Sequence, residues 1–252
     1  MRTIDLNCDL GELPLQMHNG TDEALMDLVT SVNVACGGHA GDEASMRATV
    51  QAAHRRGLAI GAHPSYPDLA GFGRQELEMA PEELTDAILA QLLALSRVMR
   101  AYGAVLHHVK PHGALYHVAS RHPEIAGAVA AACARFGQDV VVVGLAGSPM
   151  LEVCRAAGFR VVGEAFADRR YESDGTLRAR KIEGALLTAA EAESQALRLT
   201  EREEVVADGA QIVSVSAQTL CVHGDSPDAV QVASAVRRAL TSCGVAIRAF
   251  SA

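Results

Sequence analysis

Residues 104–116 read "AVLHHVKPHGALY", an apolar run that passes directly into histidines, a lysine and a proline. The apolar start predicts a buried strand over residues 104–110. Lys110 ends this strand and is one of only two lysines in a chain that otherwise uses arginine as its cation. A compact ammonium group with an adjustable pKa differs chemically from a fixed guanidinium fork. The stretch therefore predicts a strand that delivers a functional lysine to its carboxyl end.

The same unit, a short apolar run followed by a longer segment of helical period, recurs along the chain. The predicted strands are residues 3–8, 31–36, 58–62, 104–110, 139–144, 159–164 and 219–223. The predicted helices are residues 21–30, 43–57, 82–102, 123–136, 148–157, 189–203 and 226–243. This linker-free alternation predicts an α/β fold, a single seven-stranded TIM-like (β/α) barrel over residues 1–252. An apolar run at 245–250 could add an eighth strand.

An open, doubly wound sheet is the alternative fold. No G-x-G-x-x-G pattern follows the first predicted strand, and no G-x-x-x-x-G-K-[ST] pattern occurs anywhere in the chain. Both glycine patterns are typical of nucleotide-binding sites in open sheets. Their absence from the sequence favours the closed barrel.

Composition narrows the class of protein. The formal net charge of −8 argues against nucleic-acid binding, which needs a basic face. No stretch of 18 or more apolar residues occurs, so no membrane span is expected. The six cysteines form no C-x-x-C pair and stand among apolar residues. We interpret them as reduced, buried thiols of a cytoplasmic protein.

Polar or ionisable residues lie at or just beyond the ends of six predicted strands. In barrel enzymes the active site lies at these carboxyl ends. The candidates are Asp9 and Glu12 after strand 1, Asn33, His39 and Asp42 around strand 2, His63 and Arg74 after strand 3, Lys110 and His112 at strand 4, Glu164 at strand 6, and His223 and Asp225 after strand 7. A lone histidine after a strand is more often structural, so the prediction rests on the whole set. The basic stretch 178–181 is expected on a solvated loop, with Arg180 able to reach an anionic substrate.

The period of two along a strand refines this prediction, because alternate residues share a face. Polar residues alternate in this way at Asp5, Asn7 and Asp9, and again at His108, Lys110 and His112, provided that the chain stays extended through Pro111. A barrel strand is buried on both faces, so the polar face should point into the lumen. Each unpaired polar group buried there would cost roughly 2–7 kcal/mol. We therefore expect these groups to pair with one another or to serve function.

Six blocks of the sequence together resemble the LamB/YcsF family. They are "IDLNCDLGE" (4–12), "NVACGGHAGD" (33–42), "GAHPSYPDLAGFGR" (61–74), "HVKPHGALY" (108–116), "EAFADRRY" (164–171) and "CVHGDSP" (221–227). The resemblance runs in matching order from about residue 4 to 243. It implies a seven-stranded (β/α) barrel related to carbohydrate deacetylases. It also implies that the chain acts with two partner subunits, B and C, to open 5-oxo-L-proline to L-glutamate while ATP is hydrolysed to ADP and phosphate.

The residue types suit this implied reaction. An activated lactam needs a cation for its oxygen, a base for water and a proton donor for the leaving nitrogen. Lys110 fits the first role, His112 or His63 fits the second, and Asp9 or Glu12 could orient a histidine or serve as the acid. The expected catalytic residues are Asp9, His63, Lys110 and His112. The expected substrate-binding residues are Asn7, Glu12, Asn33, His39, Arg74, Glu164, His223 and Asp225.

The expected cofactor is ATP with Mg²⁺. The isolated chain should bind ATP weakly and depend on its partners, because the rim is rich in acids and the sequence has no phosphate-binding glycine loop. No tightly bound metal is expected, since Lys110 would repel a cation. Two alternatives stay open. One is a metal-dependent deacetylase or amidohydrolase acting on a small amide or carbohydrate, with a divalent ion on Asp9, His39 and His63. The other is a non-catalytic lactam-binding subunit.

Overall fold

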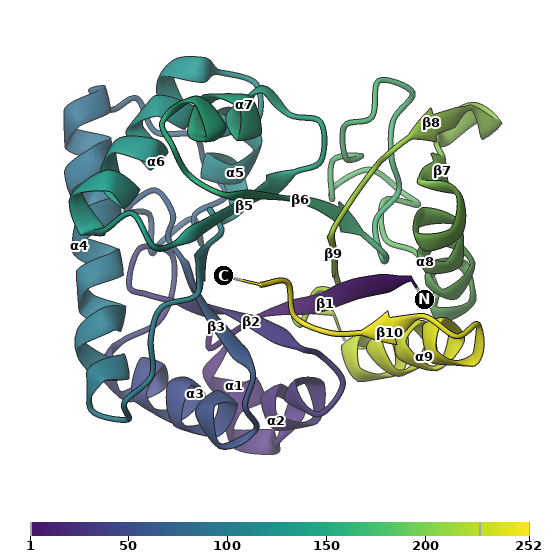
Figure 1. Cartoon of the computed structure of the whole chain (residues 1–252), viewed down its shortest axis with the longest axis horizontal. Helices are drawn as coiled ribbons and strands as arrows, with labels where there is room; N and C mark the ends of the chain where they lie inside the picture. Colours follow the sequence, from purple (N-terminus) through teal and green to yellow (C-terminus); the bar gives the residue numbers. More distant parts are fainter. Residues whose placement is uncertain (1, 227, 252) are drawn as a thin grey trace.

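Seven parallel strands close into a barrel in this computed structural model, which describes residues 2–226 and 228–251 (Figure 1). The strands follow the order β1-β2-β3-β4-β5-β6-β9, and β9 pairs back onto β1. Their bounds are β1 Thr3–Leu10, β2 Ser31–Ala35, β3 Ala59–His63, β4 His108–Val109, β5 Val141–Leu145, β6 Val161–Phe166 and β9 Thr219–Cys221. The predicted seven-stranded barrel is confirmed.

Helices surround the barrel (Figure 1). Their bounds are α1 Pro14–Asn19, α2 Thr21–Met26, α3 Glu43–Arg55, α4 Pro81–Arg100, α5 Gly113–Ala119, α6 Pro123–Phe136, α7 Pro149–Ala156, α8 Ala189–Arg202 and α9 Ala229–Ser242, with a 3₁₀ turn at Asp208–Ala210. The helices α4, α6 and α7 begin with proline at the first turn, where no backbone N–H is needed. Asp42 caps α3 by accepting a hydrogen bond from the Ser45 N–H. Asp42 therefore serves the helix and does not line the cavity at the carboxyl ends of the strands.

The sequence pattern missed two short helices, α1 and α5. It also missed two strands that pair as a hairpin, β7 Glu204–Val206 and β8 Ile212–Ser214. The strand β4 is also shorter than the predicted 104–110, and Val105 is 83% exposed. Beyond β4 the backbone N–H groups of Lys110 and His112 still donate to β3 and the residue after it, at the Ala62 and Pro64 carbonyls. Extended geometry therefore persists through Pro111, which is the condition under which His108, Lys110 and His112 share a face.

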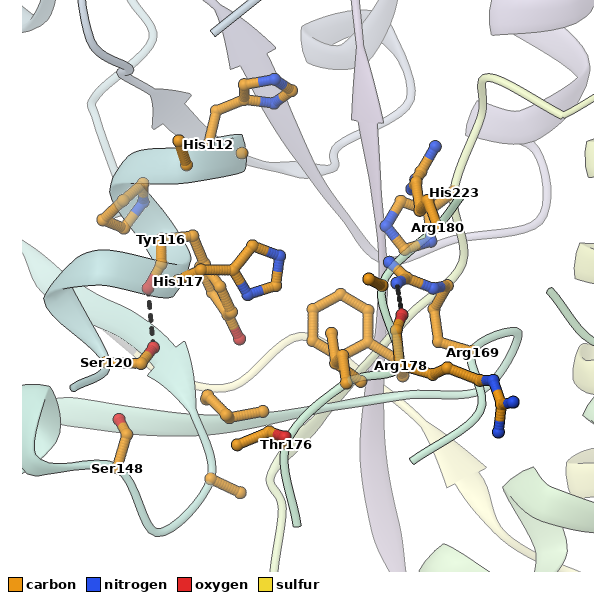
Figure 2. A pocket seen from close by; sticks show the side chains of 18 of the residues that line it. His112, Tyr116, His117, Ser120, Ser148, Arg169, Thr176, Arg178, Arg180 and His223 are labelled. Carbon is orange, nitrogen blue, oxygen red and sulfur yellow. Dashed lines mark hydrogen bonds between the residues drawn. The ribbon is translucent and has the colours of Figure 1, made fainter. Parts of the chain in front are cut away.

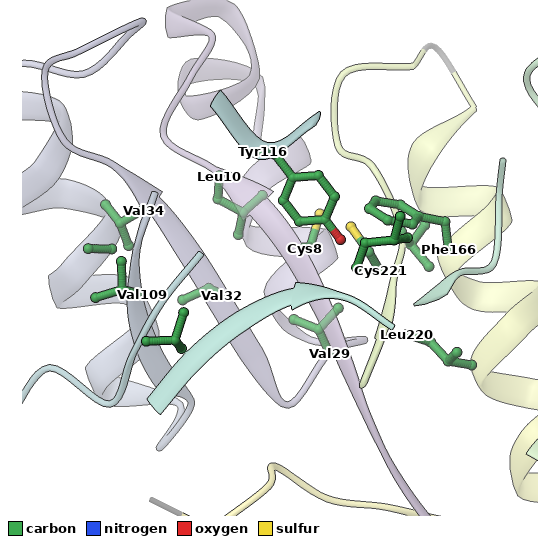
Figure 3. Close-up of a cluster of buried hydrophobic side chains, with 14 of the residues drawn as sticks. Cys8, Leu10, Val29, Val32, Val34, Val109, Tyr116, Phe166, Leu220 and Cys221 are labelled. Atoms are coloured by element: carbon green, nitrogen blue, oxygen red, sulfur yellow. The ribbon is translucent and has the colours of Figure 1, made fainter. Parts of the chain in front are cut away.

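The barrel strands place apolar side chains on one face and polar side chains on the other, as the alternation along the sequence predicts. On β1 the side chains of Leu6 and Cys8 join the apolar core between strands and helices, part of which Figure 3 shows. On the opposite face Asn7 donates to the Glu164 carboxylate and the Thr219 hydroxyl, at 2.9 and 2.7 Å. The polar face is luminal, and its groups pair with one another.

The C-terminal tail closes the end of the barrel opposite the carboxyl ends of the strands. Its strand β10, Ala246–Ile247, pairs with the start of β1 outside the closed ring, so the possible eighth strand does not enlarge the barrel. In Figure 1 the yellow tail that follows β10 runs to the barrel centre. There Phe250 packs against Val141, Val143 and Val162, which form a small apolar cluster separate from the main core.

Two other sequence-based expectations can be checked in the described part of the chain. None of its helices is both long and apolar enough to cross a membrane. The six cysteines are all unpaired, but only five are buried, because Cys243 is exposed after α9. The interpretation of Cys243 as a buried thiol was therefore wrong.

We expect Phe250→Ala to lower the free energy of unfolding by about 1–3 kcal/mol. A fully buried Phe→Ala change costs ~3–5 kcal/mol, and Phe250 is only half-buried. Urea unfolding followed by circular dichroism measures the change. Val105→Ala, at an exposed position, is the control and should change stability little. Equal free energies of unfolding for the two variants would show that the packing of Phe250 against the barrel contributes nothing to stability.

Candidate functional site

A cavity of about 890 Å³ opens at the carboxyl ends of the barrel strands. Figure 2 shows His112, Tyr116 and His117 on one side of it and Arg169, Arg180 and His223 on the other. Eight of the twelve predicted site residues line the cavity: Asp9, Glu12, His63, Arg74, Lys110, His112, His223 and Asp225. The structure thus brings these residues together, and their individual roles stay predictions.

Lys110 lies at the floor of the cavity with its side chain 2% exposed. Its Nζ donates to Asp9 Oδ1 at 2.9 Å and lies 2.8 Å from Glu164 Oε1. Burial disfavours the ammonium form, but these carboxylates outweigh burial and raise the pKa of Lys110 well above its ordinary value. Lys110 is therefore charged. Its Nζ also lies 5.6 Å from the centre of the Phe166 ring, which leaves the ammonium between acids and an aromatic face.

Asp9 connects Lys110 to the histidines, because its two oxygens point to different partners. Oδ1 accepts hydrogen bonds from Lys110 and from Asn33 Nδ2, the latter at 2.7 Å. Oδ2 lies 3.2 Å from His63 Nε2. Burial would raise the pKa of Asp9, but the charges of His63 and Lys110 outweigh burial and hold that pKa well below its ordinary value. Asp9 is therefore an ionised bridge between the two parts of the site.

The second part is a cluster of Glu12 with three histidines. Glu12 Oε1 lies 3.0 Å from His39 Nε2, 3.2 Å from His112 Nδ1 and 3.8 Å from His63 Nε2. The facing nitrogens of His63 and His112 are 3.0 Å apart. Burial lowers the pKa of His39 to about 4 and lowers the pKa of His112. Burial acts the same way on His63, but there the Asp9 carboxylate prevails and the pKa is raised.

Four predicted substrate-binding residues do not line the cavity: Asn7, Asn33, His39 and Glu164. All four are buried behind its surface, and their side chains contact residues that do line it. The barrel is narrow at this level. A Cβ on Gly61 would lie 2.1 Å from His108 Nε2, so glycine is needed for His108 to reach Asn33 across the lumen, at 2.7 Å. The four residues hold the site in place, and direct contact with substrate stays a prediction for them.

Cations from a long connection between β6 and α8 form the opposite wall. Arg169 is 3% exposed, its guanidinium donates to the Arg178 carbonyl, and its Nε has no hydrogen-bond partner among the described residues. Arg178, Arg180 and Lys181 of the same connection also line the cavity, and Arg121 lines it from the end of α5. The stretch 178–181 is an irregular loop, with Ala179 and Lys181 exposed as predicted, and it also lines the cavity. No pattern in the sequence had indicated that Arg169 belongs to the site.

His223 and Asp225, which follow β9, also line the cavity. The ring of His223 stacks on Phe166, and its Nδ1 lies 3.0 Å from both oxygens of buried Asp168. Asp225 accepts hydrogen bonds from Arg74 and Arg180. The sequence reasoning missed Asp168, although it follows the predicted strand 159–164 as closely as other candidates follow theirs.

Two groups of side chains have ligand atoms close enough to hold a metal ion. One is Glu12, His63 and His112, and the other is Asp9, Cys221 and His223. In the second group burial raises the pKa of the Cys221 thiol well above its ordinary value, which disfavours the thiolate that metals bind. The set expected for the metal-dependent alternative, Asp9, His39 and His63, is not among these groups in the described residues.

Comparisons with known proteins agree on one family. Residues 4–252 match the LamB/YcsF family. The A subunit of 5-oxoprolinase from Chloroflexus aggregans is 47% identical over 249 residues, which are 98% of this chain and 99% of that protein. The corresponding 5-oxoprolinase subunit of Heliobacterium modesticaldum is 44% identical over 247 residues, which are 98% of this chain and 97% of that protein.

Solved structures agree with the sequence comparisons. The crystal structure of a lactam utilization protein from Thermus thermophilus has a TM-score of 0.91 at 44% identity, covering 98% of this chain and 100% of that chain. A family 4 carbohydrate esterase from Streptomyces lividans reaches only a TM-score of 0.49 at 11% identity, so the relation to carbohydrate deacetylases stays a prediction. The family match and the close relatives both extend over nearly the whole chain, and the chain therefore belongs to the LamB/YcsF family.

Proposed function

We propose that this chain is the A subunit of an ATP-dependent 5-oxoprolinase, which opens 5-oxo-L-proline to L-glutamate together with subunits B and C. The names of its close relatives support the activity. The observation that carries the proposal for this chain is the buried, charged Lys110 at the floor of a cavity whose opposite wall is cationic. The cavity, about 890 Å³, is within the ~300–1,000 Å³ range of small-molecule sites.

The reaction needs an activated lactam, because an ordinary amide carbonyl is a poor electrophile. Transfer of the terminal phosphoryl group of ATP to the lactam oxygen forms an O–P bond and releases ADP. Water then adds to the ring carbonyl carbon, and the C–N bond breaks to leave an acyl phosphate and an amine that takes up a proton. A second water releases phosphate, so that 5-oxoproline, ATP and two waters give glutamate, ADP and phosphate.

The residues on the acidic side of the cavity suit these steps. Lys110 is the cation proposed to stabilise charge on the lactam oxygen. The cluster of Glu12, His63 and His112 is proposed to activate the water. Asp9 contacts both groups through different oxygens, so it holds the oxygen-binding and water-activating groups in one fixed arrangement.

The cationic wall is proposed to bind the negative groups of the substrates. 5-Oxoproline has a carboxylate, and planar guanidinium groups bind carboxylates and phosphates in a bidentate manner. Arg169 is the best placed, because it is buried and its Nε has no partner among the described residues. Phosphates of ATP and its Mg²⁺ would also approach this wall. The sequence has no phosphate-binding glycine loop, so subunits B and C are proposed to complete ATP binding.

Lys110→Met should lower turnover of the assembled enzyme by ~100-fold or more, the scale of losing one preorganised electrostatic contact. Loss of the ammonium also leaves Glu164 buried and unpaired, which alone can destabilise the fold by ~3–5 kcal/mol. The companion variant Lys110→Met/Glu164→Gln removes that second effect. Turnover and thermal melting are measured for both. A variant that melts normally and keeps near-full turnover would make Lys110 structural and would favour the non-catalytic alternative.

Arg169→Gln should raise the KM for 5-oxoproline by ~10–100-fold, the equivalent of losing a hydrogen bond between charged groups. Steady-state glutamate release by the assembled enzyme measures this change. Arg135→Gln, on the outer surface where Arg135 pairs with Asp86, is the matched control and should leave KM unchanged. Parallel behaviour of the two variants would exclude the proposed carboxylate contact.

The isolated chain should bind ATP weakly and release no glutamate. With subunits B and C added, glutamate release and 5-oxoproline-stimulated ATP hydrolysis should appear together. Calorimetry with ATP tests the lone chain, and glutamate assays with each subunit omitted in turn test the assembly. Full glutamate production by the lone chain, with micromolar ATP affinity, would contradict the three-subunit proposal.

A further inference from the structure

The geometry points to a binding site for one divalent transition-metal ion on Glu12, His63 and His112, at the floor of the cavity. The ligand atoms are Glu12 Oε1, His63 Nε2 and His112 Nδ1. This inference goes beyond the proposed lactam opening and does not depend on it.

The backbone fixes which nitrogen of each histidine carries a proton. His63 Nδ1 lies 2.8 Å from the Lys110 carbonyl oxygen, and His112 Nε2 lies 3.1 Å from the Phe72 carbonyl oxygen. A carbonyl only accepts hydrogen bonds, so these two nitrogens are the donors. The remaining nitrogens, His63 Nε2 and His112 Nδ1, therefore present lone pairs when the rings are neutral. A carbonyl partner on the outer nitrogen is how metal-binding histidines are commonly oriented.

The two inner nitrogens lie only 3.0 Å apart, so either a proton or a metal ion must lie between them. Glu12 Oε1 converges on the same point, 3.2 Å from His112 Nδ1 and 3.8 Å from His63 Nε2. A single proton on His63 Nε2 would leave the Glu12 carboxylate facing the lone pair of His112 Nδ1. A metal bound at ~2.0–2.1 Å to tetrahedral ligands spaces them by about 3.3–3.4 Å. The observed spacings bracket that value, so a metal ion fits between the three atoms with only small shifts.

The surroundings hold these rings rigidly. His39 stacks on His112 with ring centres 3.6 Å apart and planes 2° from parallel, and its Nε2 lies 3.0 Å from Glu12 Oε1. Phe72, whose carbonyl accepts from His112, has a φ of 55°. Such a left-handed conformation costs a bulky residue of order 1–3 kcal/mol and is typical of functional sites. The chain tolerates strain at the residue that orients one ligand.

The local charges also favour a divalent cation. Asp9, Glu12 and Glu164 contribute three formal negative charges, and Lys110 contributes one positive charge, which leaves −2 when the histidines are neutral. The expectation that Lys110 would repel a metal did not include its partners. Its Nζ is paired with Asp9 Oδ1 and Glu164 Oε1, so carboxylates stand around it. The expectation of no tightly bound metal stays a prediction, and a metal titration decides between the two.

The titration uses the full chain, purified without chelator, stripped of metal with dipicolinate, and then supplied with Co²⁺ or Zn²⁺. Calorimetry measures stoichiometry and affinity, and visible absorption reports Co²⁺ bound in a low-coordinate site. We expect one ion per chain. His63→Ala, His112→Ala and Glu12→Gln should each weaken binding by ~100-fold or more, because removal even of an outer-shell partner costs 10–100-fold. Circular dichroism checks that each variant is folded, and Glu12→Gln keeps the side-chain shape.

Two controls separate this site from other ligands. His54→Ala removes an exposed histidine of α3, and Cys221→Ala removes a member of the other candidate group. Both should leave affinity unchanged. The inference is overturned if the folded chain takes up no Co²⁺ or Zn²⁺, if uptake survives the Glu12→Gln and histidine variants, or if Cys221→Ala abolishes it.

Discussion

The ammonium group of Lys110 is the constraint on which the rest of the site depends. A buried charge without partners is strongly destabilising, and this one lies on the lumen side of a closed barrel. Asp9 and Glu164 are its partners, and they come from β1 and β6, neither of which pairs with β4, the strand that Lys110 follows. The two ion pairs therefore connect strands on different sides of the barrel. They lie at the level where the buried polar network of the lumen ends and the open cavity begins.

The polar side chains below Lys110 in the lumen form a chain of hydrogen bonds, in which each group depends on its neighbour for a partner. Asn7 donates to Glu164 and Thr219, Asn33 donates to both Asn7 and Asp9, and His108 reaches Asn33 only because residue 61 is glycine. A buried network of this kind is favourable only when every member is paired. A change at one lumen position would therefore be transmitted to Asp9, the residue through which Lys110 and the histidines are joined.

Local periodicity was enough to predict the barrel strands and the direction of their side chains. The alternation along residues 3–10 and 108–112 assigned the luminal face of both strands, because side-chain direction in a strand is set by the backbone alone. Periodicity could not predict that Arg169 would enter the cavity, because that placement depends on how the long connection from β6 to α8 folds back over the barrel. The short helix α5 was missed for a related reason: Pro111 and Gly113 are typical of a turn, and tertiary contacts decide that a helix follows.

The two walls of the cavity differ in charge: one has Asp9, Glu12 and the histidines, and the other has Arg169. The acids of one wall outnumber the single ammonium group of Lys110, whereas Arg169 on the other wall has no carboxylate partner within ion-pair distance among the described residues. Phe166 lies between them, close to the Lys110 ammonium and stacked on His223. Charges in a partly buried site interact by several kcal/mol over a few ångströms. In the proposed function, the carboxylate of 5-oxoproline is therefore drawn to the arginine wall and kept from Asp9 and Glu12, which would turn the lactam end of the substrate toward Lys110.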